Sequence, residues 1–114
     1  MTEEAAYTMQ LSRLPEADLL RVGFGPPAKG DRVVRAAVEA FERAAPPGGR
    51  LLKINGPISI AAAMMLAHRV AHLYGAVAVF DPRLAGYIVA ISHDPEFELG
   101  QVLPEAIESD YKQS

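Results

Sequence analysis

The feature that most constrains this chain is an unbroken strand–helix–strand succession between residues 50 and 81. A strand is expected over Arg50–Asn55, and Gly56-Pro57 ends it. An alanine-rich helix is expected over Ile58–Leu73, and a continuous apolar strand over Ala76–Asp81. Two strands joined through one helix pair in parallel, with a right-handed crossover. The pattern therefore predicts an α/β fold, small and Rossmann-like.

The residues before this unit predict a hairpin and a first helix. Tyr7–Leu14 and Leu19–Phe24 are short extended runs, joined by the turn-forming Pro15–Asp18. From Asp31 onward apolar residues recur at helical spacing, as at Val34, Val38 and Phe41, until Pro46–Gly49 stops the helix.

The remaining segments extend the sheet and suggest a partner. Gly86–Ser92 is another apolar run of strand length, and a short helix is expected from Pro104. The helix at Ile58–Leu73 is apolar on every side apart from two histidines and an arginine near its end. Because such helices are normally buried on more than one face, we expect this one to contact a second subunit.

Size and composition bound the class of protein. A chain of 114 residues, half of them apolar, predicts one globular domain over residues 1–114. The net charge of −3 argues against coating long nucleic acid, although a short pocket-bound oligonucleotide needs only a few donors. There is no cysteine, the first residues do not resemble a secretory signal, and the apolar stretch Ile58–Ala67 is short for a membrane span. We therefore expect a cytoplasmic protein.

A candidate phosphate site lies where the first parallel strand meets its helix. Asn55, Gly56, Pro57 and Ser59 are placed there, among free backbone N–H groups and the positive end of the helix dipole. The alternative is structural, with Gly56 making a tight turn and Ser59 or Asn55 capping the helix. The loop carries no glycine-rich fingerprint, so sequence leaves both interpretations open.

All three histidines, His68, His72 and His93, fall in the same window, with the carboxylate of Asp81 nearby. His68 and His72 are four residues apart on the expected helix, so their rings can share a face and a metal ion. The alternative is that they are ordinary packed or surface histidines.

Asp81-Pro82-Arg83 closes the second parallel strand, at the carboxyl end where open α/β sheets bind ligands. An arginine there can form paired hydrogen bonds with a phosphate. The competing interpretation is a type I turn with Pro82 at its second position and an Asp–Arg ion pair.

These groups cannot all meet within one subunit. A crossover helix runs antiparallel to its strands, so its start lies at the end of the sheet with Asp81, and His72 lies at the other end, about 16 Å away along the strand. If Gly86–Ser92 returns antiparallel, His93 joins His72. Chemistry that needs both ends requires head-to-tail contact between subunits, which can continue as a stack or filament.

Taken together, these residues resemble a known family. The matching runs are Asn55–Pro57, Leu66–His72, Val77–Leu84 and Ser92-His93. They resemble the small CRISPR-associated ring nucleases of type III systems, also described as manganese-dependent exonucleases that remove adenosines from RNA ends. Most of the chain takes part in the resemblance.

The resemblance implies a compact relative of the Rossmann-fold domains that sense cyclic oligoadenylate. It implies homodimers that hold cyclic tetra-adenylate between them and cleave it, ending the antiviral signal. It assigns His72, Asp81 and Arg83 to catalytic or metal-associated positions and His93 to RNA contact. His68 also matches a family histidine. The loop Asn55–Pro57 departs from other members, which carry serine, extra glycine or arginine there.

The function expected is therefore a metal-dependent ring nuclease acting on cyclic tetra-adenylate. Manganese is the expected cofactor, held by Asp81 and His72, with His68 and His93 as further candidates. Arg83 and the residues of the loop, together with His93, would hold the ligand. Two alternatives remain: a manganese-dependent 3′ RNA exonuclease that removes terminal adenosines, and a non-catalytic sensor or sponge that binds the ring intact. Neither a membrane nor long duplex nucleic acid is an expected partner.

Overall fold

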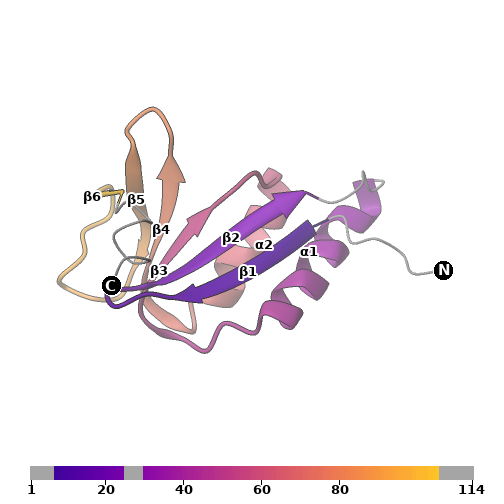
Figure 1. The fold of residues 1–114 in the computed structure, drawn as a ribbon, viewed down its shortest axis with the longest axis horizontal. Coiled ribbons are helices and arrows are strands. Elements are labelled where there is room, and N and C mark those ends of the chain that lie inside the picture. The colour runs from indigo at the N-terminus through magenta and orange to yellow at the C-terminus, as the bar shows by residue number, and fades with distance from the viewer. Residues whose placement is uncertain (1–6, 25–29, 106–114) are drawn as a thin grey trace.

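The computed structural model describes residues 7–24 and 30–105, which form one mixed sheet in chain order, β1-β2-β3-β4-β5-β6 (Figure 1). The strands are β1 (Tyr7–Arg13), β2 (Asp18–Phe24), β3 (Gly49–Asn55), β4 (Tyr74–Asp81), β5 (Gly86–Ser92) and β6 (Val102–Pro104). The pairs β2–β3 and β3–β4 are parallel, and the other neighbours are antiparallel. The predicted α/β class, the amino-terminal hairpin and the parallel β3–β4 pair are confirmed.

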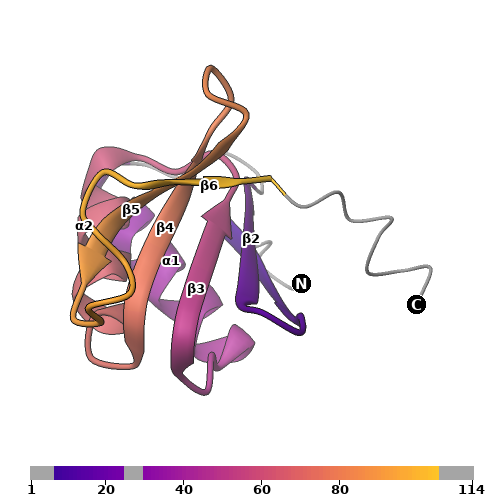
Figure 2. The ribbon, with the colours of Figure 1, turned by 90° about the vertical axis from the view of Figure 1, so that its left-hand side faces the viewer.

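Both helices, α1 (Gly30–Ala44) and α2 (Ile60–Val70), lie on the same face of this sheet (Figure 2). Each joins two parallel strands, so the chain contains a second crossover, β2–α1–β3, that we did not predict from sequence. The core beneath the helices is built by residues from four strands and both helices, the fully buried ones being Leu20, Ala37, Leu52, Ala62 and Val70.

The opposite face carries no helix among the described residues. Its smaller core contains Leu51, Tyr87 and Val89 from the strands and Phe97 from the segment between β5 and β6. That segment and β6 cross the edge of this face (Figure 2). One face of the sheet is therefore covered by helices, and the other is covered, among the described residues, by the segment after β5 and by β6.

The buried face of α1 differs in detail from the prediction. Phe41 is buried as expected, but Val34 and Val38 are only half-buried, and the fully enclosed positions are Ala37 and Ala40. The small alanine side chains let the helix approach the sheet closely, which apolar spacing alone does not reveal.

The second helix is shorter than predicted. It was expected over Ile58–Leu73 but runs over Ile60–Val70. Ser59 is its N-cap, with Oγ accepting a hydrogen bond from the backbone N–H of Ala62 at 3.2 Å. His72 therefore lies in the turn after the helix, not on it. Of the helices in the described residues, neither has the length and hydropathy needed to cross a membrane.

The helix expected from Pro104 lies mostly outside the described residues. Pro104 itself closes β6.

Candidate functional site

The loop after β3 has a structural explanation for each of its polar or special residues. The side-chain amide of Asn55 donates to the Tyr87 hydroxyl at 3.2 Å, and Ser59 caps α2. Gly56 has a φ of 131°, and a Cβ at this position would collide with the backbone carbonyl of Val22 on β2. The turn-and-cap interpretation therefore accounts for this loop. Gly56 and Pro57 are nevertheless exposed, so a ligand can reach their backbone.

The hairpin turn between β4 and β5 is organised by Asp81. Its carboxylate accepts the backbone N–H of Arg83 at 2.8 Å, and its carbonyl accepts that of Leu84 at 3.1 Å. Arg83 Nε lies 3.6 Å from the same carboxylate oxygen, yet the Arg83 side chain is 89% exposed. The turn with an ion pair is thus present, and the guanidinium keeps donors that face solvent. Arg83 can therefore take part in the turn and still offer its guanidinium to a ligand.

The histidines gather at the other end of β4. The rings of His68 and His72 meet edge to face with centroids 5.4 Å apart, although only His68 lies within α2. His93 follows β5, and its backbone N–H donates to the Gly75 carbonyl at 2.7 Å. All three histidines are exposed.

Strand direction separates the two groups. In the β4–β5 register Asp81 pairs with Gly86 at the hairpin tip, whereas Ala76 pairs with Ser92 next to His93. The strand β4 spans Tyr74–Asp81, about 23 Å at roughly 3.3 Å per residue. Figure 1 shows the β4–β5 tip projecting beyond the rest of the sheet. Asp81 and Arg83 therefore lie at one end of the molecule and His72 and His93 at the other.

A metal site requires several donor groups that converge on one point. Among the described residues of one chain, no set of three or more histidine, aspartate or glutamate side chains is placed to hold a metal ion. The pair His68–His72 and the carboxylate of Asp81 are too far apart in the fold to share one. The described residues of one chain therefore do not supply a complete metal site.

An exposed apolar stripe runs along α2 toward the histidines. Ile60 is 81% exposed and Met64 is 70% exposed, and the same spacing of four residues continues to His68 and then His72. A helix with this much exposed apolar surface is suited to contact with another protein chain.

A buried polar contact lies near the histidine end. Tyr74 donates its hydroxyl hydrogen bond to Asp18 Oδ2 at 2.7 Å, and Arg13 forms an ion pair with the same carboxylate. Burial raises the pKa of Tyr74 far above its ordinary value of 10.0, and the hydrogen bond to Asp18 raises it further. This contact joins β2 to β4 beneath β3 and is structural in character.

One residue of chemical interest, Lys53, was not predicted from the sequence. Lys53 is only 7% exposed, and its Nζ lies 5.2 Å from the centre of the Tyr87 ring. The available signal was the strand alternation, which places Lys53 on the same face as Leu51 and Asn55 and opposite to Leu52 and Ile54.

The fold and these positions define a mixed α/β domain with exposed cationic and histidine groups at opposite ends. Residues 48–104 match the family described as CRISPR-associated protein (Cas_csx3). The match covers half of the chain and contains all of the candidate residues from Asn55 to His93. The chain therefore belongs to this CRISPR-associated family. A search of curated proteins finds no match to the chain.

Proposed function

We propose that this protein is a metal-dependent ring nuclease that binds and cleaves cyclic tetra-adenylate, and so switches off type III CRISPR antiviral signalling. The observation that carries the proposal is the family match over residues 48–104, because it spans every residue to which the resemblance gives a role. The CRISPR-associated family defines the biological setting, and the ring nuclease activity is our inference within it. Kinship with the Rossmann-fold ligand-sensing domains is part of the same inference.

The separation of the two ends supports a site completed between subunits. Asp81 and Arg83 lie at the hairpin tip, and His72 and His93 at the opposite end of the sheet. A head-to-tail contact brings the tip of one subunit to the histidine end of the next. A ring of four nucleotides held in such a contact would touch both groups at once.

The exposed stripe on α2 supports a homodimer as the unit that stacks. Ile60 and Met64 present apolar surface that a partner would cover. A dimer formed through Ile60 and Met64 would leave the hairpin tip with Asp81 and Arg83 free for stacking.

The proposed cleavage requires one group that binds the phosphate and one that transfers a proton, and the two ends of the sheet carry groups suited to these tasks. The ribose 2′-oxygen attacks phosphorus, its proton passes to a base, and the bond to the 5′-oxygen breaks as that oxygen takes up a proton. The exposed guanidinium of Arg83 is suited to holding the phosphate charge, and an imidazole such as that of His72 is suited to moving the proton. Because no single chain gathers three donors among its described residues, a manganese ion would need donors from two subunits or from the ligand. Such an ion, when bound, would neutralise charge on the phosphate.

One experiment distinguishes this function from its alternatives. The pure protein is incubated with cyclic tetra-adenylate and with a linear adenylate-ended RNA, each with manganese and with a chelator, and products are separated by chromatography. We expect manganese-dependent opening of the ring. Intact ring in every condition would leave only a sponge, and preferential shortening of the linear RNA would favour the 3′ exonuclease.

Asp81→Asn separates the role of Asp81 in the turn from a role in catalysis. The asparagine keeps an oxygen that accepts the Arg83 N–H but removes the negative charge. We expect the melting temperature to stay close to that of the parent protein and ring cleavage to fall about a hundredfold or more. The matched control is Glu39→Gln, which removes one exposed carboxylate from α1 and is expected to leave cleavage unchanged.

A further inference from the structure

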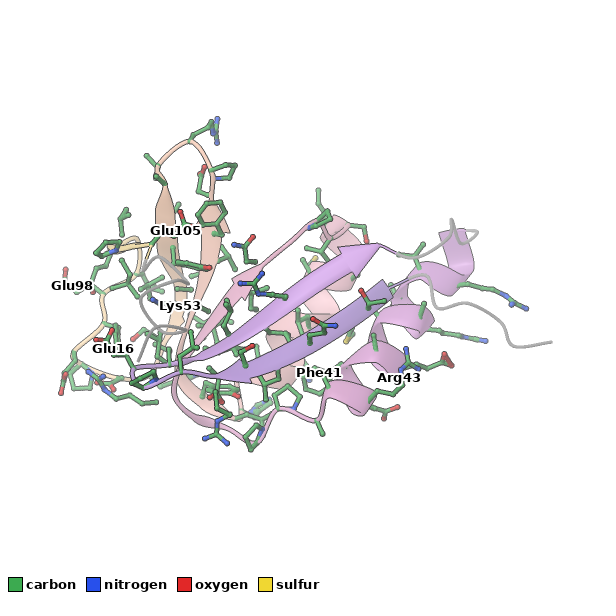
Figure 3. All side chains as sticks on the ribbon, in the orientation of Figure 1. Glu16, Phe41, Arg43, Lys53, Glu98 and Glu105 are labelled. Atoms are coloured by element: carbon green, nitrogen blue, oxygen red, sulfur yellow. The ribbon has the colours of Figure 1, made fainter. Side chains whose placement is uncertain are left out.

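The sheet face without helices contains a pocket that the proposed nuclease site does not use. Its volume is about 290 Å³, and it lies between β3, the turn before β2, the segment after β5 and β6. The lining residues are Glu16, Arg50, Leu51, Lys53, Phe97, Leu103 and Pro104. Figure 3 shows Lys53 and Glu16 on this side of the molecule and Arg43 of α1 at the far side.

The pocket contains a buried lysine without a counter-ion. Lys53 is more than nine-tenths buried, and its one polar contact in the described residues is the face of the Tyr87 ring. No carboxylate in the described part of the chain forms an ion pair with it, and the exposed Glu16 at the rim does not reach it. No fully buried side-chain nitrogen among the described residues lacks a hydrogen-bond partner, so Nζ, which has none, still opens toward the pocket and solvent. The three N–H donors of Lys53 are therefore available to a ligand.

The second cation of the pocket is already neutralised. Arg50 Nη2 lies 2.5 Å from a Glu96 carboxylate oxygen, and Nε lies 3.8 Å from Asp94. The guanidinium also stacks over Phe97 at 4.8 Å from the ring centre. Of the two cations that line the pocket with Glu16, Lys53 is thus the one without a carboxylate at ion-pair distance among the described residues.

We propose that this pocket binds a small molecule with an oxyanion end, a phosphate or a carboxylate, attached to an apolar body. The anion would accept hydrogen bonds from Lys53 Nζ, and the body would lie against Leu51, Leu103 and Pro104. Charge-assisted hydrogen bonds of this kind are strong and require an acceptor of opposite charge. The volume is at the lower limit for ligand pockets, so the occupant is a small molecule and not an oligonucleotide. The proposal does not depend on the nuclease function.

Binding at Lys53 has a route to the loop after β3. Lys53 and Asn55 contact the same tyrosine, Lys53 at the ring face and Asn55 at the hydroxyl of Tyr87. Asn55 leads directly into Gly56-Pro57. A bound anion is therefore expected to perturb signals along Lys53, Tyr87 and Asn55.

Nuclear magnetic resonance of the full chain tests the proposal. The chain contains three lysines, so selective ¹³C labelling of lysine gives few signals and allows Lys53 to be assigned by substitution. The probes are inorganic phosphate, adenosine monophosphate and butyrate, titrated at constant ionic strength. We expect saturable shifts at Lys53 and at the amides of Tyr87 and Asn55. If only the phosphate-containing probes cause saturable shifts, the ligand class is a phosphate ester. If only butyrate causes them, the ligand class is a carboxylate.

Lys53→Met supplies the specific control because it removes the charge at similar volume. We expect it to fold with an unchanged or higher melting temperature and to bind the active probe at least about tenfold more weakly. Arg43→Gln, which removes one positive charge on α1, should bind normally. Unchanged affinity in Lys53→Met would overturn the proposal. If that variant did not fold, the parent titration would still decide, because shifts absent from Lys53 with every probe contradict an anion site there.

Discussion

At the scale of single residues, the contact of Tyr74 with Asp18 offers the most direct test of buried polar energetics. We expect Tyr74→Phe to lower the free energy of unfolding by about 1–3 kcal/mol, because the buried carboxylate loses one of its hydrogen-bond donors. Chemical denaturation measures this value. Tyr87→Phe is the matched control, since the Tyr87 hydroxyl meets a neutral amide and not a buried carboxylate, and its cost should be smaller.

The raised pKa of Tyr74 predicts that the stability cost of Tyr74→Phe depends on pH. The pKa of Tyr74 is raised in the folded protein, so the unfolded chain loses the phenol proton first as the pH rises through 10.0. The stabilisation is complete below that pH and declines above it. The difference in unfolding free energy between the parent and Tyr74→Phe should therefore be constant up to about pH 9 and shrink at higher pH. A difference that stays constant through pH 11 would contradict the raised pKa.

Single residues also show which features of the structure can be predicted from the sequence. The capping role of Ser59 and the Asp81–Arg83 ion pair were both foreseen as alternatives, because they depend on neighbours close in the chain. The burial of Lys53 was not foreseen, because its contact with Tyr87 joins residues that are distant in sequence. Whether His72, Asp81 and Arg83 act in catalysis remains a prediction at this scale.

At the scale of secondary-structure elements, β1 to β5 and their order of appearance followed from apolar runs and turn residues, whereas the short strand β6 at Val102–Pro104 was not predicted. The length of α2 did not follow from such runs, since apolar residues continue on both sides of a helix that Ser59 begins and the turn at residues 71–73 ends. The crossover through α1 was also missed, because a hairpin pattern does not reveal which of its strands accepts a third neighbour. The pairing of β2 with β3 is set by tertiary packing and not by the local sequence.

Gly56 gives a prediction at this scale because it lets the turn after β3 pass close to β2. We expect Gly56→Ala to lower the free energy of unfolding by at least about 2 kcal/mol, through its positive φ and the collision with Val22. Pro57→Ala, at the exposed next position, should cost less than about 1 kcal/mol. Thermal and chemical unfolding of both variants measure this difference. Equal stability of the two variants would mean that the turn does not require Gly56. Ligand binding would then be the one role left for this glycine.

At the scale of the whole molecule, the exposed stripe of α2 predicts an interface. We expect Met64→Glu to convert a dimer into a monomer, because a charge placed in an apolar contact loses its hydration without a partner. Light scattering coupled to size-exclusion chromatography measures the change. Arg35→Glu, an exposed position on α1, should leave the oligomeric state unaltered, and a monomeric parent protein would contradict the proposed interface.

The central claim is that the groups at the two ends of the sheet form a complete site only between subunits. Neither His72→Ala nor Asp81→Ala protein should cleave cyclic tetra-adenylate alone. In an equimolar mixture, a contact between the tip of a His72→Ala subunit and the histidine end of an Asp81→Ala subunit contains both groups intact. Random head-to-tail assembly predicts recovery of about a quarter of the parent activity. A mixture that stays as inactive as its components, while each component still binds the ring, would contradict the split site.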